Sequence, residues 1–248
     1  VGSEMCIRDS PATLTTLPRK TRKDIQTLTD AQVQMFSALV EEDSYKAILK
    51  FILFSGVRES EAIGLTWDCI DFERGSIRIY HQLLKRSKSE GGYTFASLKN
   101  DKERLLTPPP MLLSILKEQK VLQMQQRIKA GPAWKGWNSP EEQEKWFVFT
   151  TELGDHYCPQ TVYAHFKKIA KKIGAENANV HSLRHTYAVL CLQNGDDVKT
   201  VQSNLGHATA AFTLDVYGHV SEKMKQDSAD RMEAYIQNTV YGKKIQNR

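Results

Sequence analysis

Apolar residues recur at three- and four-residue spacing over most of the chain, and this period predicts amphipathic helices. The first helix begins at Thr29-Asp30, and its apolar face is formed by Val33, Phe36, Leu39 and Val40. A strongly apolar helix follows over 45–55, and Gly56 ends it. Further helices are predicted at 59–67, at 111–130, from Thr161, between a Ser182 cap and an Asn194-Gly195 C-cap, at 196–206, and at 221–239.

Between residues 76 and 107 the apolar period changes to two, which predicts β-strands. Three short strands are expected, at SIRIY, YTFAS and RLLTP, with the loop KRSKSEGG between the first two and the turn KNDKE before the third. The sequence therefore predicts an α+β fold, mostly helical with a small antiparallel three-stranded sheet. WFVFTT at 146–151 predicts a further buried strand or extended segment, after a loop at 131–145 whose indoles cover the core.

Composition narrows the class of protein. The 248 residues are 40% hydrophobic and 25% charged, as in ordinary globular proteins, and the net charge of +5 is compatible with a nucleic-acid partner. The four cysteines show no C-x-x-C spacing, so neither a zinc site nor a disulfide framework is indicated. We find no apolar run of membrane-spanning length and no signal peptide, which favours a cytoplasmic protein without membrane contact.

The stretch from His181 to Tyr217 carries the candidate chemistry. His181 and Arg184 share a helix face at i and i+3, and a cap at Ser182 would place both at the N-terminal end of the helix. That end attracts anions, so the pair suggests a phosphate-binding site. A single His or Arg is more often structural or solvated, and Tyr217 alone is either a core aromatic or a nucleophile. The core face of the same helix is predicted at Leu183, Tyr187, Leu190 and Cys191.

The order of these motifs resembles a known family. HSLRHTYA followed by LGHATAAFTLDVYGH is similar to the C-terminal signature of the tyrosine recombinase (phage integrase) family, in which H-x-x-R precedes L-G-H and a tyrosine. SGVRESEAIGLTWDCID at 55–71 resembles the first-arginine box, and Lys99 in SLKNDKERLL matches the β-hairpin lysine. The resemblance covers roughly residues 29–240 and is closest in kind to the integrases of prophages and conjugative transposons.

The resemblance implies a reaction and its residues. Tyr217 would attack a DNA phosphodiester and form a 3′-phosphotyrosyl intermediate, and Lys99 would protonate the leaving 5′ oxygen. His181 would contribute a hydrogen bond or a proton transfer. No metal, ATP or other cofactor is expected. The charge on the phosphate oxygens would be stabilised by Arg58, Arg184 and His207.

The basic residues outside the motifs have two interpretations, as solvated surface or as contacts to DNA phosphates. The sequence 11–28 reads either as a solvated linker or as a strap along DNA, and 167–172 as either an exposed helix face or a DNA contact. Lys102 is close to Lys99 and competes with it for the leaving-group role. The DNA-binding candidates are Arg19, Lys20, Arg22, Lys23, Lys102, Arg104, Lys167 and Lys168.

The domain organisation follows from composition and resemblance. EMCIRDS is what GAG-ATG-TGT-ATA-AGA-GAC-AG encodes, which resembles the end of a sequencing adapter, so we interpret residues 1–10 as an assembly artefact. Residues 11–28 are expected to be a basic linker, 29–240 the catalytic domain and 241–248 a tail. The family's N-terminal core-binding domain has no room in this sequence.

The resemblance also implies partners. These are double-stranded DNA carrying attachment sites, further copies of the chain in a homotetramer on DNA, and a directionality factor; without DNA the chain would be a monomer. The last helix carries an apolar stripe that packs either in cis or on a neighbouring protomer, formed by Met224, Met232, Tyr235 and Ile236. Rival functions are DNA relaxation by a type IB topoisomerase, a DNA-binding module without catalysis, and an unrelated helical structural protein.

Overall fold

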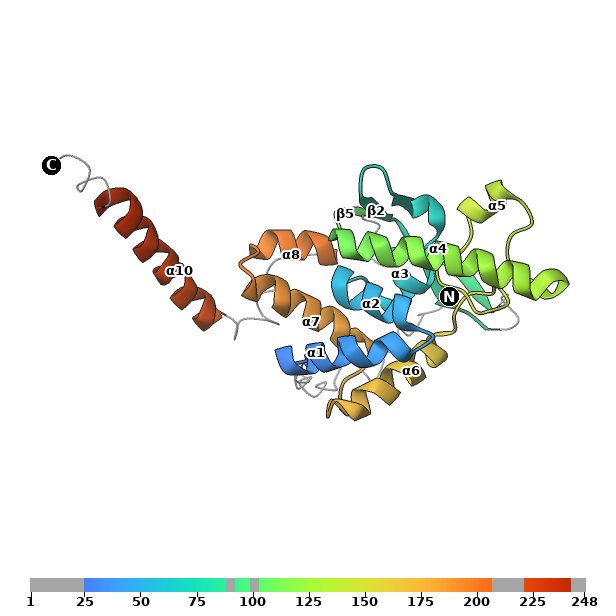
Figure 1. Ribbon diagram of the computed structural model, residues 1–248, viewed down its shortest axis with the longest axis horizontal. Helices are drawn as coiled ribbons and strands as arrows, with labels where there is room; N and C mark the ends of the chain where they lie inside the picture. Colours follow the sequence, from blue (N-terminus) through green and yellow to red (C-terminus); the bar gives the residue numbers. More distant parts are fainter. Residues whose placement is uncertain (1–24, 88–91, 99–102, 207–220, 242–248) are drawn as a thin grey trace, which may run out of the picture.

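The computed structural model describes residues 25–87, 92–98, 103–206 and 221–241. Its centre is α2 (Lys46–Ser55), which contacts α4 (Pro110–Ala130) and α7 (Val180–Gln193) and whose residues Ile48, Leu49, Phe51 and Leu53 are fully buried (Figure 1). α1 (Asp30–Leu39) packs on α6 (Pro159–Lys172), and α8 (Val198–Leu205) packs on α7. The buried core of a mostly helical domain therefore forms around one apolar helix.

The capping residues predicted for three helix ends can be compared with the structure. α1 has the expected cap, because the Thr29 hydroxyl accepts from Gln32 N–H in a capping box. α2 ends at Gly56, which has a φ of +66°. The prediction that Ser182 caps α7 was wrong: Asn179 is the N-cap, and Ser182 is its reciprocal capping-box partner one turn later.

Other helices differ from prediction in length. α3 (Glu59–Ile63) is shorter than expected, since a turn at Gly64 and a 3₁₀ segment at Trp67–Cys69 (η3) follow it. α6 begins at Pro159, two residues before Thr161. The remaining helical segments are η2 (Val40–Glu42), η5 (Gly131–Ala133), α5 (Pro140–Glu144), α10 (Ser221–Tyr235) and the π-helix Ile236–Tyr241 (η7).

The strands form two antiparallel sheets instead of the single sheet predicted. β1 (Ile70–Asp71), β2 (Ser76–Ile79) and β5 (Arg104–Leu106) pair in the order β1-β2-β5, with Ile77 opposite Leu106. β3 (His81–Lys85) and β4 (Tyr93–Ser97) form a separate pair, with His81 opposite Ser97. β3 was missed because HQLLK does not alternate polar with apolar residues.

The predicted strand at 146–151 is buried at Val148, Phe149 and Thr150. In the described part of the chain it forms isolated bridges instead of a strand, at Phe147 with Thr66 and at Thr150 with His156. In the preceding loop Trp137 is fully buried, and its ring meets that of Trp134 edge to face with the ring centres 4.9 Å apart.

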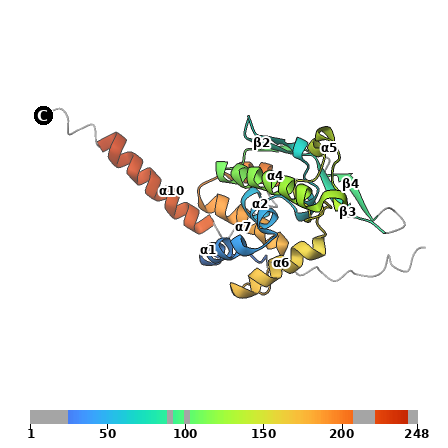
Figure 2. The ribbon, with the colours of Figure 1, turned by 45° about the vertical axis from the view of Figure 1, so that its right-hand side comes forward.

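α10 projects from the body, as Figures 1 and 2 both show. It contacts α7. Its residues Met232 and Tyr235 are each 59% exposed. Within the described part of the chain, no helix is both long and apolar enough to cross a membrane.

Gly56 gives a test of the turn that leads from α2 toward Arg58. A Cβ at this position would lie 2.3 Å from Tyr187 Cδ1 and 2.9 Å from Leu205 Cδ2, in addition to the unfavourable φ. We expect Gly56→Ala to lower the free energy of unfolding by about 3 kcal/mol in urea titration. Gly174→Ala is the control, because Gly174 has a similar φ of +69° with open space around it, and we expect it to cost about 1 kcal/mol. Equal losses in the two variants would contradict the close packing at Gly56.

Candidate active site

Arg58 is held at the start of α3 by a buried carboxylate. It is the N-cap residue, and its backbone N–H donates to Glu61 Oε2 at 2.8 Å while Nη1 donates to Glu61 Oε1 at 2.8 Å. The side chain of Arg58 is 26% exposed, and that of Glu61 is fully buried. One face of the Arg58 guanidinium is thus anchored to protein, and part of the side chain remains open to solvent.

A second arginine completes the environment of Glu61. Arg104 Nη2 donates to Glu61 Oε2 at 2.6 Å, and Nη1 donates to Oε1 at 3.1 Å. Burial raises the pKa of the Glu61 carboxyl, but the hydrogen bonds and charges of Arg104 and Arg58 outweigh it and lower the pKa to about 2. Glu61 is therefore ionised at neutral pH.

Arg104, predicted to contact DNA, is buried and paired with protein groups in this structure. Its side chain is 7% exposed, and it is occupied by Glu61 and by the carbonyl oxygen of Asn204. A buried guanidinium with these partners is not a surface cation for the DNA backbone. The sequence contained a signal for this, because alternate side chains of a strand share a face and Arg104 alternates with the buried Leu106.

Arg184 lies beneath the surface near the start of α7. It is 1% exposed; Nη1 donates to Gly56 O at 2.7 Å and Nη2 to Leu205 O at 2.6 Å. The first bond joins Arg184 to the turn two residues before Arg58, and the second joins it to the end of α8. The structure therefore brings Arg58 and Arg184 to one place, as predicted from their motifs.

His181 is exposed on the same first turn of α7. Its ring meets that of His185 edge to face at 4.6 Å. Although the residue reaches solvent, neighbouring protein displaces part of the water around its ring, and this desolvation, together with the charges of Arg184 and Arg58, lowers the pKa of the His181 imidazole to about 4. Burial likewise lowers the pKa of His185 to about 4. Both rings are neutral at pH 7, and a neutral imidazole can accept a proton or a hydrogen bond.

We expect both imidazoles to titrate near pH 4 in the protein without DNA. Because these folded pKa values lie below the unfolded value of about 6.5, the neutral rings contribute stability that is present above about pH 6.5 and is lost as the pH falls toward 4. Imidazole ¹H–¹⁵N spectra recorded across this range measure the midpoints, and His185→Asn assigns the signals. A His181 midpoint near the unfolded value would contradict the desolvation of this ring.

Several predicted site residues lie outside the described residues, so their predictions stay untested by the geometry. They are Lys99, His207 and Tyr217 among the catalytic candidates, and Arg19, Lys20, Arg22, Lys23 and Lys102 among the DNA contacts. The linker 11–28 is described only from residue 25, and residues 1–10 and 242–248 fall wholly outside.

The lysines of α6 differ from each other. Lys167 Nζ donates to the carbonyl oxygens of Glu176 and Ala178 and lies 5.9 Å from the centre of the Tyr163 ring. Lys168 is exposed. A DNA contact remains a prediction for both, and Lys167 would have to exchange these carbonyl contacts for a phosphate.

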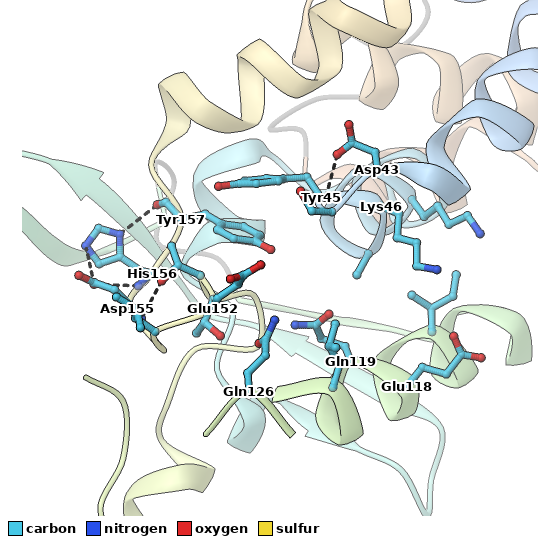
Figure 3. A pocket seen from close by; sticks show the side chains of 18 of the residues that line it. Asp43, Tyr45, Lys46, Glu118, Gln119, Gln126, Glu152, Asp155, His156 and Tyr157 are labelled. Carbon is cyan, nitrogen blue, oxygen red and sulfur yellow. Dashed lines mark hydrogen bonds and ion pairs between the residues drawn. The ribbon is translucent and has the colours of Figure 1, made fainter. Parts of the chain in front are cut away.

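A cavity of about 880 Å³ lies elsewhere, between α2, α4 and the loop 150–157 (Figure 3). Tyr45 forms part of the cavity wall. Its ring stacks on the rings of Tyr157 and His165, with distances between ring centres of 4.1 Å and 4.0 Å. Arg58, His181 and Arg184, the predicted catalytic residues that the structure describes, do not line this cavity. Among the described residues, no group of three or more His, Cys, Asp or Glu side chains is arranged to hold a metal ion.

Comparison with known sequences places this geometry in context. A model of the phage integrase family matches residues 26–224. The chain is 29% identical over 220 residues to a tyrosine recombinase XerC-like protein of Caldanaerobacter subterraneus subsp. tengcongensis, and 26% identical over 209 residues to prophage integrase IntR of Escherichia coli K12. These alignments cover 86% and 81% of this chain but 55% and 50% of the relatives, so the chain spans about half the length of the curated relatives it matches.

Solved structures share the fold. The Tn1549 transposon integrase in complex with transposon right end DNA aligns with a TM-score of 0.68 at 21% identity, over 87% of this chain and 69% of that one. The XerA recombinase aligns with a TM-score of 0.59 at 22% identity, over 88% and 67%. The α+β fold predicted from the sequence is confirmed.

Proposed function

Because the chain belongs to the phage integrase family, whose model matches most of it, we propose that it is the catalytic part of a site-specific DNA recombinase. It breaks and rejoins double-stranded DNA at attachment sites, without a metal ion or ATP. The observation that carries this proposal is the junction at which Arg184 binds the carbonyl oxygen of Gly56, two residues before Arg58. Two guanidiniums from distant motifs are thereby brought beside His181 on the first turn of α7.

In the proposed cleavage step, the Tyr217 phenol oxygen attacks the scissile phosphorus and the bond from phosphorus to the 5′ oxygen breaks. The phenol loses its proton, and the neutral imidazole of His181 either accepts it directly or holds the phenol by a hydrogen bond while a water molecule accepts the proton. Lys99 gives a proton to the 5′ oxygen. The products are a 3′-phosphotyrosyl bond and a free 5′-hydroxyl.

The positive side chains stabilise the charge that develops on the phosphate oxygens. Arg58 and Arg184 each present a planar, permanently charged fork, which suits two phosphate oxygens at once, and His207 adds a further donor. Attack of a 5′-hydroxyl on the phosphotyrosyl bond reverses the step. Since that bond conserves the energy of the original linkage, joining to a new strand needs no ATP.

Assembly is part of the same proposal. Strand exchange between two duplexes requires several copies, and we propose a homotetramer on DNA formed from chains that are monomeric without it. The projection of α10 and the exposure of Met232 and Tyr235 support a contact between copies through this helix. A directionality factor remains a proposed further partner. The DNA substrate places the protein with the chromosome, in the cytoplasm of a bacterial cell.

The test is covalent trapping. The protein is mixed with nicked duplexes made from the flanks of its own gene, in EDTA and without ATP, and separated on a denaturing gel. We expect a slowly migrating DNA species that disappears after protease treatment. A clear mobility shift at low salt without any such species would contradict catalysis and favour a DNA-binding role.

A further inference from the structure

The Glu61 carboxylate is shared between two arginines. Oε1 accepts from Arg58 Nη1 at 2.8 Å and from Arg104 Nη1 at 3.1 Å. Oε2 accepts from the Arg58 backbone N–H at 2.8 Å and from Arg104 Nη2 at 2.6 Å. The side chain of Glu61 is fully buried. Each carboxylate oxygen is therefore fixed from both sides, and the position of Arg58 depends on a carboxylate that Arg104 also holds.

The same guanidinium reaches a third element. Arg104 Nε donates to Asn204 O at 2.8 Å, at the carboxyl end of α8, where helix carbonyl groups lack partners within the helix. The approach is close, because a Cβ added at Gly206 would lie 3.0 Å from Arg104 Nη1. A side chain from β5 thus connects the start of α3 to the end of α8.

We propose that Arg104 is a positioning residue for the DNA-cleavage reaction, which holds Glu61 so that Glu61 orients the Arg58 guanidinium, and which fixes the end of α8 against α3. This inference rests on the proposed function, in which Arg58 contacts the scissile phosphate. Arg104 itself is buried and does not touch the DNA.

The chemistry of the pair explains why an arginine is required. A bidentate guanidinium contacts both carboxylate oxygens and the Asn204 carbonyl at once, whereas a lysine ammonium is a single point of charge on a flexible stem. Without Arg104, the buried Glu61 carboxylate would keep Arg58 as its one hydrogen-bond partner among the described residues. Within the part of the chain that the structure describes, the charged or titratable groups that act on Glu61 are Arg58 at the start of α3, Arg104 on β5 and His181 on α7. Loss of Arg104 therefore favours protonation of Glu61, and a protonated carboxyl orients Arg58 poorly.

The experiment compares adduct formation on saturating nicked duplex by the wild type, Arg104→Met, Arg104→Lys, Glu61→Gln and the double variant Arg104→Met/Glu61→Gln. We expect Arg104→Met to lower the cleavage rate about 100-fold, as misplacement of a catalytic group does, with little change in DNA affinity. Arg78→Met is the matched control. Arg78 lies in the same sheet and pairs with Glu103 at 2.6 Å, but the side chains of both residues are exposed. The cleavage rate of Arg78→Met should therefore match that of the wild type.

The pH profile separates positioning from general structural support. In Arg104→Met the rate should fall further as the pH is lowered from about 8 to about 5.5, because Glu61 then takes up a proton. The double variant should lose this extra acid dependence. A wild-type rate in Arg104→Met, or a reduced rate with the wild-type pH profile, would overturn the proposal. If Arg104→Met does not fold, Arg104→Lys replaces it, with about a tenfold loss and a smaller acid shift, and a wild-type profile there is equally decisive.

If the proposed function fails, the wild-type chain itself forms no adduct, which distinguishes this failure from failure of the proposed role of Arg104. The Arg104–Glu61 ion pair is then tested by thermal unfolding. Since the Glu61 pKa is lowered to about 2 in the folded protein, the stability that this carboxylate contributes is present above its unfolded pKa of about 4.3 and is lost as the pH falls toward 2. The Tm difference between the wild type and Arg104→Met should therefore be larger at pH 7 than at about pH 3. A difference independent of pH would refute the pairing itself.

Discussion

We expect the Tyr217→Phe chain to form no covalent DNA adduct while binding DNA at low salt as the wild type does. The substitution removes the single oxygen that would attack the phosphorus and leaves the aromatic ring in place. No other residue in the proposed mechanism offers a nucleophile, so the loss should be complete on the gel instead of partial. DNA affinity should persist, because it depends mainly on phosphate contacts with lysine and arginine side chains.

Tyr163→Phe is the control for this substitution. Tyr163 lies on α6 and is 45% exposed, so removal of its hydroxyl changes a surface group only. Its adduct yield should equal that of the wild type. An adduct of undiminished yield from Tyr217→Phe would mean that another residue is the nucleophile.

Arg184→Met should have the second largest effect, and it should act on two properties. Removal of the guanidinium leaves the buried carbonyl oxygens of Gly56 and Leu205 without this donor, which we expect to lower the free energy of unfolding by about 3 kcal/mol. It also removes a positive group from the scissile phosphate, which should lower the rate of adduct formation about 1000-fold. Arg184→Lys keeps the charge, but one ammonium cannot reproduce both bonds of the fork, so the rate should stay low.

Urea titration and timed adduct formation measure the two effects separately. Arg74→Met is the control, because Arg74 has an 87% exposed side chain and pairs with Asp71 at 3.7 Å; it should be neutral in both assays. If Arg184→Met lost stability but cleaved DNA at the wild-type rate, its role would be to hold α7, α8 and the Gly56 turn together, without a part in the reaction.

The sequence predicted the helices well because their periodicity and end signals agree. Gly56 ends α2 and Thr29 caps α1 for local reasons that act within one helical turn. Pairing between strands is a long-range property, and here the sequence was less informative. β4 pairs with β3 and not with β2, and neither the alternation in YTFAS nor the polar loop before it determines the partner.

In the candidate active site, too, the sequence predicted local features but not long-range contacts. Motif order identified Arg58, His181 and Arg184 as neighbours, and the structure brings them together. The motif order did not reveal that Arg184 is buried, because the two carbonyl oxygens that Arg184 binds belong to residues 128 and 21 positions away in the sequence. Arg104 was interpreted as a DNA contact because its charge was considered without the strand face it shares with Leu106. The buried partner, Glu61, is 43 residues away in the sequence.

Mapping the covalent bond tests the central claim most directly. Trypsin digestion of the DNA adduct, after nuclease trimming, leaves a short nucleotide on one peptide, which tandem mass spectrometry can locate. Cleavage after Lys199 and Lys223 gives a peptide from Thr200 to Lys223 whose only tyrosine is Tyr217. The account predicts the nucleotide on this peptide, joined through a 3′-phosphate to the tyrosine oxygen. A nucleotide on any other peptide, or joined through its 5′ end, would contradict it.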